Sequence, residues 1–153
     1  MFRVKKLTDY AVMLLVELGA AFDADPGSLR SAQTLAEDCG LEVPTVSKVL
    51  KVLTQQGLVG SCRGPAGGYR LLQPLRDISV ADVICAMEGP IAMTECSVHA
   101  GRCSVESNCR ARGQWHRISE AVLAALSGIS LAEMRPQPAA VQDRSLPLAT
   151  VNA

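Results

Sequence analysis

Three cysteines in the second half of the chain have the residue type and spacing of a metal-binding group. Cys96, Cys103 and Cys109 follow one another as C-x6-C-x5-C, with mainly small and polar residues in the intervals. Thiolates are soft ligands that bind iron–sulfur clusters, zinc and copper(I). The spacing lacks the C-x2-C pairs of a zinc ribbon. From the residues alone, free thiols and a redox disulfide also stay open.

A second group of polar residues has the character of a DNA-reading surface. Residues 32–56 are predicted to form a short helix, a turn containing glycine and a second helix, which is the layout of a helix-turn-helix. Near the start of the second helix, Thr45, Ser47 and Lys48 can exchange hydrogen bonds with base edges in a major groove. A plain helical hairpin would show the same pattern, so this segment alone leaves both interpretations open.

A glycine-rich hairpin follows and favours DNA binding. Arg63, Gly64, Pro65, Gly67 and Gly68 lie between two short apolar segments, which predicts two strands joined by a turn. The proline stiffens the tip and the glycines let the backbone approach a surface, so the arginine is placed to enter a minor groove. No strand-to-helix phosphate loop surrounds these glycines, which argues against a nucleotide site.

Helical and strand periodicity defines the framework that must position these groups. The first helix has apolar residues at helical spacing from Leu7 to Leu18, Ser31 is typical of an N-cap, and Gly57 is typical of a helix end. The predicted helices are 7–21, 32–38, 44–56, 80–88 and 110–127, and the predicted strands are 58–61 and 69–72. We therefore expect a mainly α protein with a small β-wing.

Composition restricts the class of protein. Fifteen basic and fifteen acidic residues give a formal net charge of zero, which excludes a strongly basic nucleic-acid binder. The segment 42–70 nevertheless carries four basic side chains against one acidic, enough for a local phosphate-binding patch. Asp9 and Glu17 interrupt the first apolar segment, so neither a signal peptide nor a membrane span is expected. We expect a cytoplasmic protein with no membrane partner.

Three segments together resemble a known family. LVGSCRGPAGGYRL at 58–71 is similar to the wing of the bacterial IscR/NsrR family of winged-helix transcription regulators. LTDYAV at 7–12 resembles the start of that family's first helix, and ISVADVI at 78–84 resembles the segment after its wing. The resemblance covers about residues 1–134, and the wing is its most specific part. Within the family the chain looks most like regulators of the SUF iron–sulfur assembly operon.

The resemblance implies how such a chain is organised and used. It implies a DNA-binding domain at 1–88, a cluster loop at 89–109 and a dimerisation helix at 110–134. Beyond it, the prolines and small residues of 135–153 predict a disordered tail. It implies a homodimer that binds a double-stranded, pseudo-palindromic operator as a repressor, with no enzymatic activity. The expected DNA-contacting residues are Glu42, Val43, Pro44, Thr45, Ser47, Lys48, Arg63, Gly64, Pro65, Gly67, Gly68 and Tyr69.

The resemblance also implies an iron–sulfur cluster on the three cysteines, 2Fe–2S in preference to 4Fe–4S. The fourth ligand departs from one branch of the family, because Arg112 stands where IscR-like members have a histidine. NsrR-like members use an aspartate early in the first helix of the other subunit, and Asp9 matches that place. His116, His99 and Glu106 are the alternatives. A carboxylate or exchangeable ligand would make the cluster labile, which suits a sensor.

The remaining cysteines are assigned structural roles. We expect Cys85 on the buried face of its helix, Cys39 in a helix-end turn and Cys62 on a wing strand. A small redox enzyme would need a C-x2-C motif or a nucleophile with a positioned base, and neither is present. A zinc-stabilised or cofactor-free DNA-binding regulator is the other interpretation.

Overall fold

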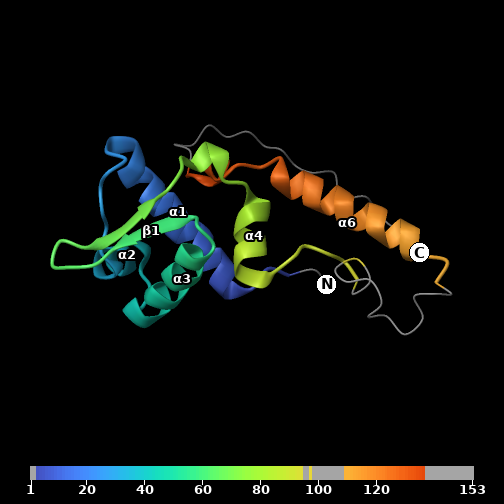
Figure 1. Cartoon of the computed structure of the whole chain (residues 1–153), viewed down its shortest axis with the longest axis horizontal. Coiled ribbons are helices and arrows are strands. Elements are labelled where there is room, and N and C mark those ends of the chain that lie inside the picture. The colour runs from blue at the N-terminus through green and yellow to red at the C-terminus, as the bar shows by residue number, and fades with distance from the viewer. Residues whose placement is uncertain (1–2, 95–96, 98–108, 137–153) are drawn as a thin grey trace.

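The computed structural model describes residues 3–94, 97 and 109–136. Helices make up most of this part of the chain, and a two-stranded antiparallel hairpin forms the wing (Figure 1). The wing and the helix α6 (Arg112–Ser127) extend towards opposite ends of the longest axis. This confirms the predicted fold class, a mainly α winged helix-turn-helix followed by a long helix. The predicted tail begins at 135, and its residues 137–153 lie outside the described part of the chain.

The helix α1 (Lys6–Ala24) is the central element of the core. Its predicted apolar stripe is confirmed, because Ala11, Leu14, Leu15 and Leu18 are at most 1% exposed. The helix runs three residues beyond its predicted end. Phe22 packs against the core there, so apolar contact continues past the predicted end at 21. The helices α2, α3 and α4 all contact α1.

The helix-turn-helix consists of α2 (Ala32–Cys39) and α3 (Val43–Gln55). Ser31 caps α2 as predicted, because its side chain accepts a hydrogen bond from the Thr34 N–H. Gly40 ends α2 with a φ of 64°, a left-handed conformation that glycine adopts without steric cost. The chain can therefore turn sharply into α3, where Pro44 lies in the first turn.

The wing is formed by β1 (Val59–Cys62) and β2 (Gly68–Leu71). The strands pair antiparallel, with Val59 opposite Leu71 and Cys62 opposite Gly68. At the base of the hairpin Val59 and Leu71 are buried, whereas residues 61–66 are exposed. The hairpin is therefore attached to the core at one end and projects at the other.

The helix α4 (Val80–Glu88) begins with a capping box between Ser79 and Asp82. The expectation that Cys85 is buried is wrong, because Cys85 is exposed. Burial on α4 falls on Ala81, Val83 and Ile84. Cys85 follows Asp82 by three residues and so shares its solvent-facing side of the helix. The predictions for Cys39, the last residue of α2, and Cys62, on β1, are confirmed.

The long helix α6 contacts α4 but leaves most of its own surface exposed. Its outer end begins at Arg112, two residues later than predicted, and its inner end leads to the 3-10 turn η3 (Leu131–Met134) (Figure 1). Leu131 is completely buried in the core. A short bridge between Ser79 and Ser130 ties this turn to the start of α4. The inner end of α6 is therefore fixed to the winged domain.

Candidate nucleic-acid interface

The helix α3 presents a polar face opposite its buried one. Its predicted apolar stripe, Val46, Val49, Leu50 and Leu53, is completely buried. Ser47, Lys48 and Lys51 are exposed on the opposite side of the helix. Since the apolar face is held by the core, this polar face is the one available to a partner.

The beginning of α3 is also accessible. Glu42 and Pro44 are exposed, and Val43 and Thr45 are partly exposed. Glu42 occupies the N-cap position but makes no capping hydrogen bond with its side chain. The N–H groups of a first helical turn carry partial positive charge, which favours phosphate oxygens nearby. This end of the helix therefore suits a polyanionic surface.

The glycines of the wing are required by the backbone conformation of the turn and by close contacts within the protein. A Cβ at Gly67 would lie 2.4 Å from the Cys62 carbonyl oxygen, and one at Gly68 would lie 2.7 Å from the Arg30 carbonyl oxygen. Gly64 has a φ of 116°, and its carbonyl accepts a hydrogen bond from the Gly67 N–H. Close approach to DNA was the reason predicted for these residues. The structure adds that the turn and its packing need glycine there.

A cleft of about 560 Å³ separates α3 from the wing. Its lining joins predicted DNA-contacting residues to residues that the sequence reasoning missed. The predicted residues in the lining are Ser47, Arg63, Gly67, Gly68 and Tyr69. Lys51, one of the four basic side chains of the predicted patch at 42–70, also lines it. The missed residues are Ser31, Ala32, Thr54, Gln55, Ser61 and Cys62. Helical spacing could have found one of them, because Thr54 follows Ser47 by two turns.

The longer side chains that line this cleft carry mainly hydroxyl, amide and cationic groups. Lys51 and Arg63 contribute positive charge, and no acidic residue of the described ranges lines it. Within the part of the chain that the structure describes, the Thr54 Oγ1 atom is the buried side-chain polar atom without a hydrogen-bond partner. A buried hydroxyl without a partner is unfavourable by about 1–3 kcal/mol. The exposed Ser47, Lys51 and Arg63 side chains offer donors and positive charge to an anionic ligand in this cleft.

The predicted metal ligands are only partly within the described residues. Cys96, Cys103, His99 and Glu106 lie outside them. Cys109 is half-buried three residues before α6. Residues 3–94, 97 and 109–136 contain no group of three or more histidine, cysteine or acidic side chains able to hold a metal ion. The donor set predicted from sequence, three thiolates and a carboxylate, suits an iron–sulfur cluster chemically.

Asp9, the predicted fourth ligand, is exposed in the first turn of α1. It lies on a groove of about 480 Å³ with an otherwise largely apolar lining. The other lining residues are Arg3, Val4, Lys6, Thr8, Val12, Val80, Ile84 and Met134. Asp9 is thus accessible from outside its own chain, as a ligand donated to a partner must be. His116, one of the alternatives, is partly exposed on α6.

A carboxylate joins the start of α1 to the end of α4. Glu88 Oε1 accepts hydrogen bonds from the Lys5 N–H at 2.8 Å and from Thr8 Oγ1 at 2.7 Å. The Thr8 hydroxyl, then the Lys5 N–H, hold the pKa of the Glu88 carboxyl below its usual value. The helix carrying Asp9 is therefore tied to the helix from which the cysteine segment departs.

Cys39 is a poor nucleophile in this structure. Burial, followed by the nearby Glu17 and Asp38 carboxylates, raises the pKa of its thiol. A raised pKa keeps the thiol protonated at neutral pH, and the thiolate is the reactive form. This agrees with the structural role predicted for Cys39.

Comparison with known proteins places the chain in a family. The model of the Rrf2 family, described as an iron-dependent transcriptional regulator, matches residues 4–137. The HTH-type transcriptional regulator IscR of Photobacterium profundum is 31% identical over 125 residues, 82% of this chain and 70% of that protein.

Two solved structures share the fold. CymR, the global cysteine regulator of B. subtilis, aligns with a TM-score of 0.65 and 25% identity over 88% of this chain and 96% of that one. IscR of T. potens aligns with a TM-score of 0.61 and 29% identity, over 87% and 85% of the two chains. None of the helices in the described ranges has the length and apolar character of a membrane span. The chain belongs to the Rrf2 family and is an IscR-like, DNA-binding transcriptional regulator, not an enzyme.

Proposed function

We propose that the protein represses transcription by binding a double-stranded operator as a homodimer, with α3 in the major groove and the wing in the adjacent minor groove. The cleft between α3 and the wing carries this proposal. A sugar-phosphate strand separates the two grooves of DNA, and the cleft separates the two elements that would read them. Its cationic and hydroxyl lining, with Lys51 and Arg63, matches that strand.

The proposed contacts divide by role. The exposed start and polar face of α3 would read base edges and nearby phosphates, using Glu42, Val43, Pro44, Thr45, Ser47 and Lys48. The wing would use Arg63 in the minor groove, while Gly64, Pro65, Gly67, Gly68 and Tyr69 shape the tip that carries it. Lys51 and Ser31, both on the cleft, are added as phosphate contacts.

The homodimer is supported by the exposed apolar side chains of α6. Trp115, Ile118 and Leu123 are each about 40% exposed, and Ile129 just beyond the helix is 39% exposed. Large apolar side chains on a projecting helix commonly mark a protein interface. A two-fold axis along α6 would present two α3 helices to successive major grooves, which are about 34 Å apart.

The sensor function is proposed for the cysteines. Cys96, Cys103 and Cys109 would hold an iron–sulfur cluster, 2Fe–2S in preference to 4Fe–4S, with Asp9 of the second subunit as fourth ligand. When bound, the cluster would supply chemistry sensitive to iron supply, oxidation and nitric oxide. The exposure of Asp9 and the position of Cys109 just before α6 support this assignment.

The packing of α4 against α6 suggests how the predicted cluster loop at 89–109 would influence DNA binding. The loop lies between α4 and α6 in the sequence, and these two helices contact each other. At its start the Met93 N–H donates a hydrogen bond to Ser119 Oγ on α6. A change in this segment would move α6 relative to the winged domain, and a shift of a few ångströms would mismatch the half-sites. We propose that the regulated genes are those of SUF iron–sulfur assembly, in the cytoplasm.

Anaerobic purification tests both halves of the proposal. We expect iron and sulfide in the wild-type protein, their loss in Cys103→Ala, and different affinities of the loaded and iron-free forms for the promoter of the SUF genes. Wild-type protein that lacks iron and sulfide under these conditions would contradict the sensor. Equal affinity of the two forms would contradict regulation by the cluster.

A pair of arginine variants tests the wing. Arg63→Ala should weaken binding to the same DNA by roughly tenfold to a hundredfold, because a minor-groove cation is lost, while the cluster absorbance stays the same. Arg76→Ala removes an arginine that is also exposed but lies in the 3-10 turn η1 (Leu75–Asp77), outside α3 and the wing. It should change the affinity by less than about twofold. Unchanged affinity of Arg63→Ala would refute the wing assignment.

A further inference from the structure

One residue outside the wing and outside α3 is bonded to both the wing and α2. The Arg30 N–H donates to the Tyr69 carbonyl, and the Tyr69 N–H donates to the Arg30 carbonyl, each at 2.9 Å. Arg30 therefore forms an antiparallel bridge beside β2. The tight fit of Gly68 against the Arg30 backbone allows this approach.

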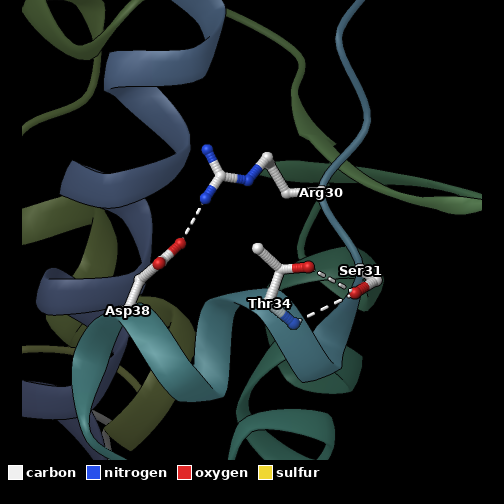
Figure 2. A network of polar contacts seen from close by, with 4 residues as sticks. All are labelled: Arg30, Ser31, Thr34 and Asp38. Atoms are coloured by element: carbon white, nitrogen blue, oxygen red, sulfur yellow. Dashed lines mark hydrogen bonds and ion pairs between the residues drawn. The ribbon is translucent and has the colours of Figure 1, made fainter.

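The side chain of Arg30 reaches a different element. Its guanidinium forms an ion pair with the carboxylate of Asp38 in the last turn of α2 (Figure 2). The next residue, Ser31, caps the beginning of the same helix through the Thr34 N–H. Arg30 thus connects the wing to the end of α2, and its neighbour Ser31 caps the beginning of that helix.

The carboxylate of Asp38 lies at an unfavourable position unless a cation neutralises it. A carboxylate in the last turn of a helix faces the negative end of the helix dipole, which disfavours it. In a helix-turn-helix the first helix lies across the DNA backbone, where a negative charge also opposes binding. The side chains of Arg30 and Asp38 are 28% and 35% exposed, so the pair is partly shielded from solvent. The ion pair offsets both disadvantages.

We propose that Arg30, held by Asp38, is a positioning residue that sets the angle of the wing against α3, so that both grooves of the operator are engaged at once. This inference rests on the proposed function. A two-stranded hairpin is only marginally stable by itself, so its direction depends on what anchors its base. The tip lies three to four residues beyond Gly68, about 12 Å at the rise of a strand. A tilt of about 10° at the anchor would then move the tip of the turn that Arg63 begins by about 2 Å, more than a binding site tolerates.

Removing the carboxylate distinguishes positioning from simple electrostatics. Asp38→Asn deletes a negative charge near DNA, so electrostatics alone predicts equal or tighter binding. Positioning predicts the opposite, a weakening of roughly fivefold to twentyfold. The matched control is Glu37→Gln, which deletes the neighbouring carboxylate on α2 that is bonded to Gln33. It should leave binding within about twofold of the wild type. Asp38→Glu keeps the ion pair and should restore most of the affinity.

The measurement uses the loaded, full-length protein and a DNA duplex that the wild type selects from a randomised library. Salt is held constant, because phosphate contacts make affinity salt-dependent. Thermal unfolding confirms that each variant is folded. In the Arg63→Ala background, Asp38→Asn should weaken binding by less than about twofold more, since the contact that it positions is already absent.

Three outcomes separate this inference from the proposed function. Tighter or unchanged binding by Asp38→Asn, matching Glu37→Gln, would overturn the positioning role, as would full additivity with Arg63→Ala. If Arg63→Ala itself binds like the wild type, the wing assignment fails and the positioning role fails with it. Weakened binding by Asp38→Asn that depends on Arg63 and is rescued by Asp38→Glu would establish the positioning role.

Discussion

Glu88 caps the beginning of α1 from the end of another helix, and we expect Glu88→Ala to lower the free energy of unfolding by about 2 kcal/mol. The N-cap residue of α1, Lys5, makes no capping hydrogen bond with its own side chain. Glu88 takes over this role, accepting the Lys5 N–H and the Thr8 hydroxyl. Its charge also lies at the positive end of the α1 dipole.

The size of the expected loss in free energy of unfolding follows from the burial of Thr8. Thr8 is 1% exposed, so loss of Glu88 leaves a hydroxyl without its acceptor in the protein interior, at about 1–3 kcal/mol. The Lys5 N–H is exposed and can bond to water instead. The Lys5 ammonium, 3.9 Å from Glu88 Oε2 and 70% exposed, adds little. Replacing Thr8 with valine in the Glu88→Ala background should recover about 1 kcal/mol, because the orphaned hydroxyl is then absent.

The stabilisation by Glu88 should decrease in acid. Hydrogen bonds from Thr8 and Lys5 hold the pKa of Glu88 in the folded protein below its ordinary value of 4.5. The unfolded chain then binds the proton more readily than the folded one, so acid favours unfolding. The stabilisation by ionised Glu88 is fully present above about pH 5 and is lost as pH falls through the folded pKa. The difference between wild type and Glu88→Ala should therefore shrink below pH 4.5.

Urea denaturation of iron-free protein measures the effect without a contribution from cluster binding, and one fixed protein concentration keeps the contribution of association constant among variants. Glu37→Ala is the control, since its carboxylate and its partner Gln33 are both exposed, and it should change stability by less than about 0.5 kcal/mol. If Glu88→Ala is as stable as this control at pH 7, or if its deficit is no smaller at pH 3 than at pH 7, the capping interpretation is refuted.

Three further changes test other parts of the structure. Leu131→Ala should cost about 2–5 kcal/mol in urea denaturation, because Leu131 is completely buried where η3 joins the core; a loss under 1 kcal/mol would contradict that anchoring. Gly67→Ala should weaken operator binding by roughly tenfold or more in a gel shift, because its Cβ would meet the Cys62 carbonyl at 2.4 Å and distort the wing tip. Ile118→Asp should shift the protein from dimer to monomer in sedimentation; an unchanged dimer would exclude this part of α6 from the interface.

The secondary structure was predictable because its signals are local. The buried stripe of α3 repeats at helical spacing, and all four of its predicted residues are completely buried. Ser31 and Ser79 cap helices because their hydroxyls reach N–H groups only three residues away. Gly57 adopts a φ of 74° just after α3, where few other residues fit.

Errors arose where local signals did not decide the outcome. Cys85 was expected on the buried face of α4 because cysteine is often buried, but it shares a side of the helix with Asp82 and is exposed. The helix α6 is a different case, because it was predicted to pair with a second subunit, and the structure leaves Trp115 and Ile118 exposed in the single chain. The same pattern predicts an interface between chains as well as one within a chain.

The sequence by itself determined the helix-turn-helix, the wing, the exposed face of α3 and the cysteine spacing, since each depends on residues close together in the chain. Only the tertiary structure decided which distant groups meet. Glu88 reaches Lys5 and Thr8 across 83 and 80 residues, and the Arg30 backbone meets Tyr69. The cleft that combines Ser31, Lys51 and Arg63 likewise exists only after folding. Periodicity encodes which side of an element is buried, but not the partner that it is buried against, because that depends on how the whole core packs.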